Sequence, residues 1–402
     1  DLFKVQLPMA KPMVVLGINQ TVMAAVSFVV IAALIGAPGL GKPIISALTI
    51  RNVGQGFVAG FAVVFLAILL DRSTSAAAKK QVSFIPPSQK DLRRRRILIG
   101  VGALIAIACA YLSRTFLWAA VWPEQFNVAT QVENVTNSIT KWILANLEIF
   151  TEGFKNLISY GVLNPLESLL AGSPWYVTVG FVVALALVVA GLRVAVLSLC
   201  LALLIVLSGL WYESMLTLTQ TIVGTLLTML VGMALGIWTG RNDRVEKFLR
   251  PFLDAGQTLP AFVYLVPMLG LFGPTRFTAI ATGIVYSIPI VVKIVCEGIR
   301  SVPYSLVEAA TAAGSTTKQI ITKVQLPAAK KTILLAVNQG LIYVLAVVVI
   351  GGFVGSGGLG YLVIVGNAKP ELQGKGLLAG ACILLLGVIF DRIMQASAKR
   401  TS

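Results

Sequence analysis

Residues 332–353 read TILLAVNQGLIYVLAVVVIGGF, an apolar run of 22 residues that contains no charged side chain. A helix of about 20 apolar residues is long enough to cross the hydrocarbon core of a bilayer. The sequence predicts ten membrane spans of this kind, the other nine at 13–35, 53–70, 97–117, 175–192, 194–211, 217–240, 256–273, 278–296 and 376–390. The fold predicted from these runs is an all-α polytopic membrane protein.

The composition supports this class and excludes several others. Of the 402 residues, 57% are hydrophobic and 12% are charged, and the mean hydropathy is +0.89. A net charge of +16 would suggest a nucleic-acid partner for a soluble protein, but basic residues also gather in the cytoplasmic loops of membrane proteins. The chain has no histidine, and its four cysteines lie in separate apolar runs. We therefore expect no nucleic-acid partner, no catalytic residues, no metal site and no disulfide framework.

The charged loops predict an orientation in the membrane. The densest basic stretch lies within 73–96, which we interpret as a cytoplasmic linker because basic loops face the cytoplasm. The basic segments 241–250 and 297–331 then also lie in the cytoplasm, together with the C-terminus, and the glutamate-rich segment 123–174 lies outside. Apolar residues recur in 123–174 at three- to five-residue steps, which predicts an amphipathic helix on the outer membrane face. Contact with an external partner is the alternative use of that helix.

The sequence also contains a repeat. Residues 4–41 align without a gap with residues 323–360, and 17 of these 38 positions are identical at an offset of 319. After one inserted residue the match resumes, with Ala-Gly at 59–60 and 379–380 and Asp-Arg at 71–72 and 391–392. The repeat predicts that residues 1–72 are the last part of one copy and residues 97–402 a complete second copy, both pointing the same way through the membrane. We expect the natural chain to begin roughly 300 residues earlier and to carry the rest of the first copy.

Nucleotide chemistry is not expected on this chain. Residues 36–42 (GAPGLGK) fit the first seven positions of a phosphate-binding loop, but Pro43 stands where Ser or Thr would reach magnesium. Acidic and basic side chains are missing from the middle of every predicted span, and proton-coupled carriers usually need them there. An ion-coupled secondary carrier stays an alternative, because backbone carbonyls can hold sodium.

The segment 299–331 is too long for a simple connection between two spans. A helix starting at Val302-Pro303 carries alanines at 309, 310, 312 and 313, and Gly314 ends it with an expected left-handed bend. A second short helix is predicted from Thr316 to Val324, ended by Leu326-Pro327. Alanines remove side-chain bulk, so the first helix suits a groove on another protein; an ordinary loop helix is the alternative, and both interpretations stay open.

These residues carry a family resemblance. Glu308-Ala309-Ala310, Gly314 and Leu326-Pro327 resemble the EAA loop of ATP-binding-cassette (ABC) importer permeases, the segment that docks on the ATPase subunit. The segment 253–267 (LDAGQTLPAFVYLVP) and the later pairs Asn338-Gln339 and Asp391-Arg392 are similar to permeases of glycine betaine and proline betaine importers. The segment 348–353 (VVIGGF) departs from the family pattern more than its counterpart 27–32, and tandem fusion departs from the usual single unit.

The resemblance implies a type I ABC importer permease in a bacterial inner membrane that carries a small quaternary amine. It also implies two partners, a cytoplasmic ATPase dimer that binds ATP and magnesium and an external or periplasmic substrate-binding protein. The expected ATPase-coupling residues are Glu308, Ala309, Ala310, Ala313, Gly314, Leu326 and Pro327, with Leu7 and Pro8 in the first copy. The expected substrate-pathway residues are Gln257, Thr258, Pro260, Phe262, Tyr264, Asn338 and Gln339, with Asn19 and Gln20 in the first copy.

Overall fold

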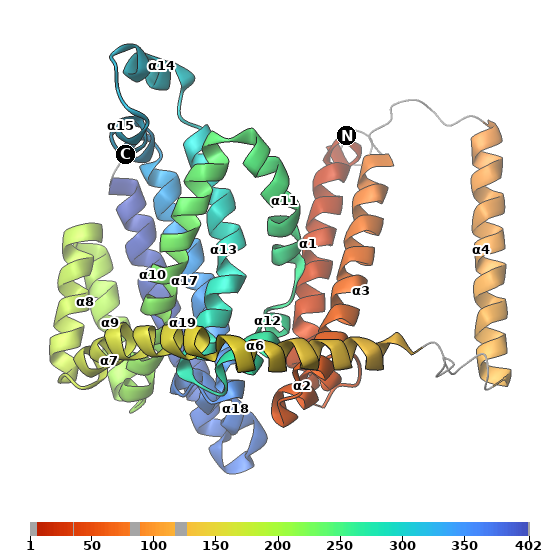
Figure 1. Ribbon diagram of the computed structural model, residues 1–402, viewed down its shortest axis with the longest axis horizontal. Coiled ribbons are helices and arrows are strands. Elements are labelled where there is room, and N and C mark those ends of the chain that lie inside the picture. The colour runs from red at the N-terminus through yellow and green to blue at the C-terminus, as the bar shows by residue number, and fades with distance from the viewer. Residues whose placement is uncertain (1–5, 35, 81–88, 117–126, 401–402) are drawn as a thin grey trace.

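The computed structural model describes residues 6–34, 36–80, 89–116 and 127–400, and every regular element in these ranges is helical (Figure 1). The long helices are α1 (Leu7–Leu34), α3 (Val53–Lys80), α4 (Gln89–Thr115), α6 (Val128–Ile158), α10 (Trp211–Arg241), α13 (Arg276–Arg300), α17 (Lys330–Ile350) and α19 (Gln373–Arg400). Shorter helices and helical turns connect them, namely α2 (Gly41–Ile50), η3 (Ser159–Leu163), α7 (Asn164–Ala171), α8 (Trp175–Ala190), α9 (Leu192–Leu207), α11 (Asp243–Thr258), α12 (Ala261–Phe272), α14 (Tyr304–Ala312), α15 (Thr317–Gln319), η4 (Ile320–Gln325), α16 (Leu326–Ala328), η5 (Gly351–Val354), α18 (Gly358–Ala368) and η6 (Pro370–Leu372). The predicted all-α fold is confirmed.

Within the described residues the structure gives fewer candidate spans than the ten predicted, and the predicted span 13–35 reaches residue 35, outside those residues. Six helical segments of the described chain are long and apolar enough to cross a membrane, and two bent helix pairs raise the number to eight at most. The six are Val53–Thr74, Arg96–Thr115, Trp211–Arg241, Arg276–Arg300, Lys330–Val354 and Pro370–Ala398. Arg96–Thr115, within α4, stands apart from the other helices (Figure 1).

Two of the predicted spans form a hairpin of short helices. Helices α8 and α9 have 16 residues each, so each is about 24 Å long, and a bilayer core is about 30 Å thick. Gly191 separates them with φ +95°. The predicted span 256–273 is also broken, because Pro260 is extended and α11 and α12 meet there at 99°.

A three-helix core of α10, α13 and α17 positions the segment between α13 and α17. Glycines on α10 let α13 approach closely: a Cβ on Gly232 would lie 2.5 Å from Val291 Cγ1, and one on Gly240 would lie 2.8 Å from Ile299 Cβ. Small residues four positions apart are a common means of close helix packing in membranes. Val291, Val295 and Ile299 are accordingly buried.

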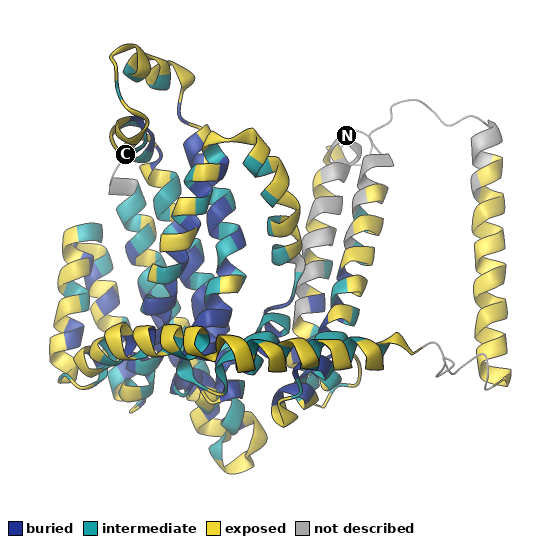
Figure 2. Ribbon diagram, viewed as in Figure 1, coloured by how far each residue is buried: buried dark blue, intermediate teal, exposed yellow. Residues whose placement is uncertain are grey.

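The amphipathic helix predicted within 123–174 forms as α6, and its side away from the bundle is exposed (Figure 2). It runs crosswise to the long helices and lies toward the end of the bundle that holds α2 and α18 (Figure 1). The opposite end carries α14, α15 and the C-terminus. The loops predicted to be external and those predicted to be cytoplasmic therefore lie toward opposite ends of the bundle.

The sequence repeat has a counterpart in the helices. The order long helix, short helix, long helix occurs as α1, α2 and α3 and again as α17, α18 and α19. Matching glycines lie in the first turns of the short helices. A Cβ on Gly41 would lie 2.9 Å from Val30 Cα, and one on Gly360, at the offset of 319, would lie 2.7 Å from Val349 Cα. The two segments thus share local packing as well as sequence.

Candidate functional site

Helix α14 is the helix predicted to couple to another protein. Pro303 precedes it in an extended conformation, and Gly314 follows it with φ +77°. The N–H of Gly314 donates to Thr311 O at 2.9 Å, and the N–H of Ser315 donates to Ala310 O at 3.0 Å. The predicted left-handed bend is confirmed, and it turns the chain back toward the membrane-spanning helices.

None of the nine residues of α14, all of them described, is buried. Tyr304 is 77% exposed, and the predicted coupling residues Glu308, Ala309 and Ala313 are exposed. Ala310 is half-buried, and α14 contacts the following turn η4. The helix thus projects from one end of the bundle with most of its surface uncovered (Figure 2).

The base of this loop is fixed. Thr316 and Gln319 form a capping box at the start of α15, and Ile320 and Gln325 in η4 are each 6% exposed. Arg241, the last residue of α10, donates a hydrogen bond to the side-chain oxygen of Gln325. The loop therefore presents α14 from a fixed position.

The predicted end of the second helix at Leu326-Pro327 is wrong. These residues open α16, because a proline in the first turn of a helix needs no intrahelical N–H. Leu326 is half-buried against a cluster that includes Val302 and Ala329, and Pro327 is exposed. Leu7 and Pro8 lie at the start of α1, and their side chains are outside the described part.

Beneath the loop, charged residues join α11 to α13. Lys293 Nζ lies 2.5 Å from Asp254 Oδ1 and 2.5 Å from Gln257 Oε1. Arg300 Nη2 lies 2.6 Å from Asp243 Oδ1. A pocket of about 410 Å³ opens here, lined by Thr239, Glu246, Arg250, Leu253, Asp254, Lys293, Cys296, Glu297 and Arg300. Gln257, a predicted pathway residue, therefore accepts a hydrogen bond from the side-chain ammonium of Lys293.

Tyr264, another predicted pathway residue, belongs to an aromatic cluster. Its hydroxyl donates to Gly256 O at 2.8 Å, and its ring lies 5.8 Å from that of Tyr286. The ring of Tyr286 lies 5.5 Å from that of Tyr343, so α12, α13 and α17 each contribute one ring. The sequence reasoning missed Tyr286 and Tyr343, although a tyrosine in the middle of an apolar span is a signal that could have found them.

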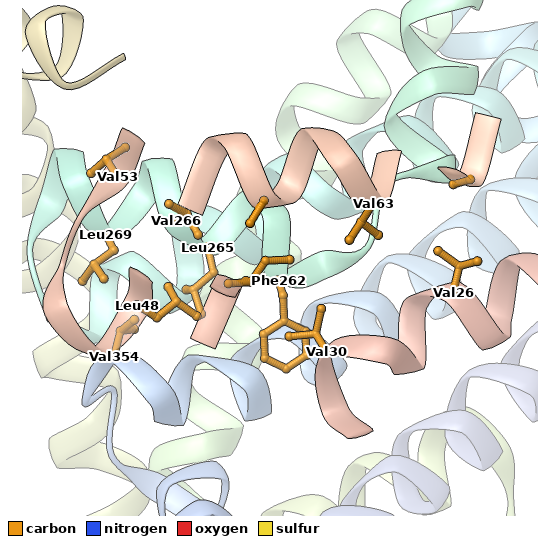
Figure 3. Packing of buried hydrophobic residues seen from close by; sticks show 13 residues of the cluster. Val26, Val30, Leu48, Val53, Val63, Phe262, Leu265, Val266, Leu269 and Val354 are labelled. Atoms are coloured by element: carbon orange, nitrogen blue, oxygen red, sulfur yellow. The ribbon is translucent and has the colours of Figure 1, made fainter. Parts of the chain in front are cut away.

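The other pathway residues are dispersed. Phe262 is 2% exposed and packs near Val30 of α1 and Val63 of α3 (Figure 3), and Pro260 is also buried. Asn338 Nδ2 donates to Asp391 Oδ1 at 3.0 Å, whereas Asn338 Oδ1 has no partner among the described residues. Gln339 is half-buried, and the side chains of Thr258, Asn19 and Gln20 are outside the described part. The structure thus brings together Tyr264 and its two partner tyrosines, and Gln257 with Lys293, but gathers no single site from the predicted set within the described chain.

Comparison with known proteins identifies the family. Residues 232–402 match the family described as "Binding-protein-dependent transport system inner membrane component". The trimethylamine N-oxide transport system permease protein of Pelagibacter ubique is 31% identical over 98% of this chain and 55% of its own length. The glycine betaine/proline betaine permease of Escherichia coli is 35% identical over 63% of this chain and 72% of its own length, and the glycine betaine permease of Bacillus subtilis is 33% identical over 65% and 92%.

The chain spans 55% and 59% of the two trimethylamine N-oxide permeases that it matches. It covers more than two thirds of the E. coli and B. subtilis permeases at over 30% identity. The chain therefore belongs to the inner-membrane components of binding-protein-dependent transport systems, the permease subunits of ABC importers.

Proposed function

We propose that this chain forms the membrane pathway of an importer for a small methylated amine, such as trimethylamine N-oxide or glycine betaine. The observation that carries the proposal is the similarity to permeases named for those two solutes, which extends over 98% and 63% of the chain. The solutes share a compact head of methyl groups on a positively charged nitrogen.

ATP hydrolysis would take place on a separate cytoplasmic subunit that receives α14. Support comes from the exposure of α14, from its alanines and from the fixed base of the loop, because a rigid and slender helix loses little entropy when it docks. A substrate-binding protein would deliver the solute at the opposite end, where α6 and α18 lie. The C-terminus would then face the cytoplasm.

The pathway would lie between two permease copies. Residues 1–72 and the repeat in α17 to α19 support two copies, and α1 and α3 of the first copy already pack against α12 of the second. The cluster of Tyr264, Tyr286 and Tyr343 is our candidate contact for the methylated nitrogen, because the face of an aromatic ring attracts a quaternary ammonium group.

The proposal is tested by purifying the transporter with the proteins that remain bound to it and reconstituting the assembly in liposomes. We expect a bound ATPase and uptake of trimethylamine N-oxide, glycine betaine, choline or carnitine that requires ATP and the binding protein. Uptake driven by a sodium or proton gradient, without ATP and without a bound ATPase, would instead support a secondary carrier.

A further inference from the structure

Helices α3 and α19 are counterparts in the repeat. Val53–Lys80 and Gln373–Arg400 have 28 residues each and match at an offset of 320. They share Gly54 with Gly374 and Gly60 with Gly380. They also contact the preceding short helix alike: a Cβ on Gly56 would lie 3.1 Å from Ala47 Cβ, and one on Gly376 would lie 2.9 Å from Gly366 Cα. If one of the two helices has a neighbour that the other lacks, the matching face of the other helix is a candidate site for an equivalent neighbour.

Helix α3 is covered by two helices of the second copy, α6 and α12. The N–H of Gly54 donates to Asn137 Oδ1 of α6 at 2.8 Å, and a Cβ on Gly54 would lie 2.4 Å from Glu133 O. A Cβ on Gly60 would lie 2.8 Å from Val263 Cγ1 of α12. The two glycines thus mark close contacts between the copies.

The matching face of α19 is uncovered. Within the described ranges, a Cβ on Gly374 or on Gly380 would meet no atom closer than 4 Å. Leu377, the counterpart of Phe57, is 80% exposed. Phe57 itself is half-buried and lines a groove with residues of α6 and α12.

On another face of the same two helices, α19 is buried and α3 is exposed. Leu386 and Ile389 of α19 are each 3% exposed, in a cluster with residues of α8 and α9. Their counterparts on α3, Leu66 and Leu69, are 41% and 62% exposed. Each helix thus lacks the neighbours that the other has. This is the pattern expected if α8 and α9 cover α19 of their own copy, while α6 and α12 reach across to α3 of the other copy.

We propose that the face of α19 formed by Gly374, Leu377 and Gly380 receives the counterparts of α6 and α12 from a second permease copy. The occupant would place an apolar, β-branched side chain against Gly380, as Val263 does against Gly60. It would also offer an amide oxygen to the N–H of Gly374, which lies in the first turn of α19, where backbone donors lack intrahelical acceptors. The inference rests on the proposed pairing of two copies and does not depend on the solute.

The contact is tested by photo-crosslinking in the full natural transporter. Leu377→p-benzoylphenylalanine places an aromatic probe where the first copy has Phe57. The same probe at Phe181 of α8 is the control, because Phe181 is 65% exposed and does not belong to the proposed face of α19. The probe at Phe57 is the positive control and should attach to a peptide of α6 or α12.

We expect the probe at position 377 to attach to a peptide of the second permease copy and the probe at position 181 to give only lipid adducts. Lipid adducts alone at 377, or attachment to the ATPase or the binding protein, would overturn the inference. Loss of the Phe57 adduct would remove its premise and overturn it as well. The crosslinking experiment measures which peptides lie near the probe and does not measure solute uptake. Its failure can therefore be distinguished from failure of the proposed function.

A steric test is independent of the probe. We expect Gly380→Leu to lower uptake about tenfold through overpacking. Gly180→Leu on α8 should leave uptake unchanged, because a Cβ on Gly180, like one on Gly380, meets no described atom within 4 Å but Gly180 lies outside the proposed face. Gly60→Leu should match Gly380→Leu, since Gly60 makes the equivalent contact with Val263. Equal uptake by the Gly380 and Gly180 variants would contradict the proposed contact.

Discussion

Gly236 on α10 lies so close to Val295 on α13 that a Cβ on the glycine would stand 2.6 Å from the Cβ of the valine. This contact sits in the middle of the row formed by Gly232, Gly236 and Gly240. Because α13 leads directly into the loop that carries α14, the spacing of α10 and α13 sets the position of α14. The contact therefore links the packing of the bundle to the proposed docking on an ATPase.

We expect Gly236→Leu to separate α10 from α13 and to destabilise the protein by about 1–3 kcal/mol, the usual cost of overpacking. A thermal unfolding curve in detergent measures the effect. Gly180→Leu on α8 is the matched control, because among the described residues a Cβ there meets no atom within 4 Å. The control should keep or slightly raise the melting temperature, since leucine favours helix more than glycine. Equal melting temperatures for the two variants would argue against close packing at Gly236.

Substitutions in the loop that carries α14 should lower uptake and substrate-stimulated ATP hydrolysis without unfolding the protein. Ala313→Trp adds bulk on an exposed surface of the loop, so it should block docking while leaving the loop intact. Ala310→Trp should act on docking and on the packing of the loop itself, because Ala310 is half-buried. Glu308→Lys should weaken docking through charge. The measurements are expression, uptake and substrate-stimulated ATP hydrolysis, with Ala106→Trp on the exposed helix α4 as the control for added bulk.

Gly314→Val should impair the same function by a different route. A residue with φ +77° is strained when it is β-branched, and the cost of a left-handed conformation is about 1–2 kcal/mol. A Cβ at Gly314 has no described atom within 4 Å, so the strain comes from the backbone alone. Gly314→Asn, which tolerates this conformation better, should recover much of the uptake. Parental uptake in both the Ala313→Trp and the Gly314→Val variants would contradict the coupling role.

The tyrosine cluster gives a prediction about the solute. Tyr286→Phe keeps a ring and should keep most uptake, whereas Tyr286→Leu should lower it several-fold if a cation contacts the ring, an interaction of about 0.5–2 kcal/mol. A neutral analogue with a tert-butyl group in place of the trimethylammonium group provides the control. The loss on going from Phe to Leu should be larger for the charged solute than for the neutral one. Equal losses would indicate packing of the cluster rather than recognition of a cation.

The sequence could predict the features that depend on short-range patterns. Apolar runs located most of the spanning helices, the period of 123–174 predicted α6, and Gly314 was expected in the left-handed conformation that the structure shows. The number of spans predicted from the sequence exceeds the number found in the described residues. Hydropathy does not show that Gly191 separates α8 from α9 or that the chain bends at Pro260. The tyrosine cluster and the contact of Lys293 with Asp254 join residues on different helices, and their proximity depends on helix packing that one sequence does not display.

Orientation is the last prediction, and the arrangement of the two ends makes it testable. Arg94 lies in the second turn of α4 and Ala313 follows α14, whereas Trp142 belongs to α6 and Lys369 follows α18. All four are exposed. Helix α14 lies at one end of the bundle, and α6 and α18 lie toward the other (Figure 1). Cys109 and Cys200 are exposed, so the single cysteines should be introduced after both have been replaced by alanine. In intact cells an impermeant maleimide should label Trp142→Cys and Lys369→Cys, and in permeabilised cells it should label all four. Labelling of Ala313→Cys in intact cells would place α14 outside, where no ATPase can reach it, and would contradict both the orientation and the coupling role of the helix.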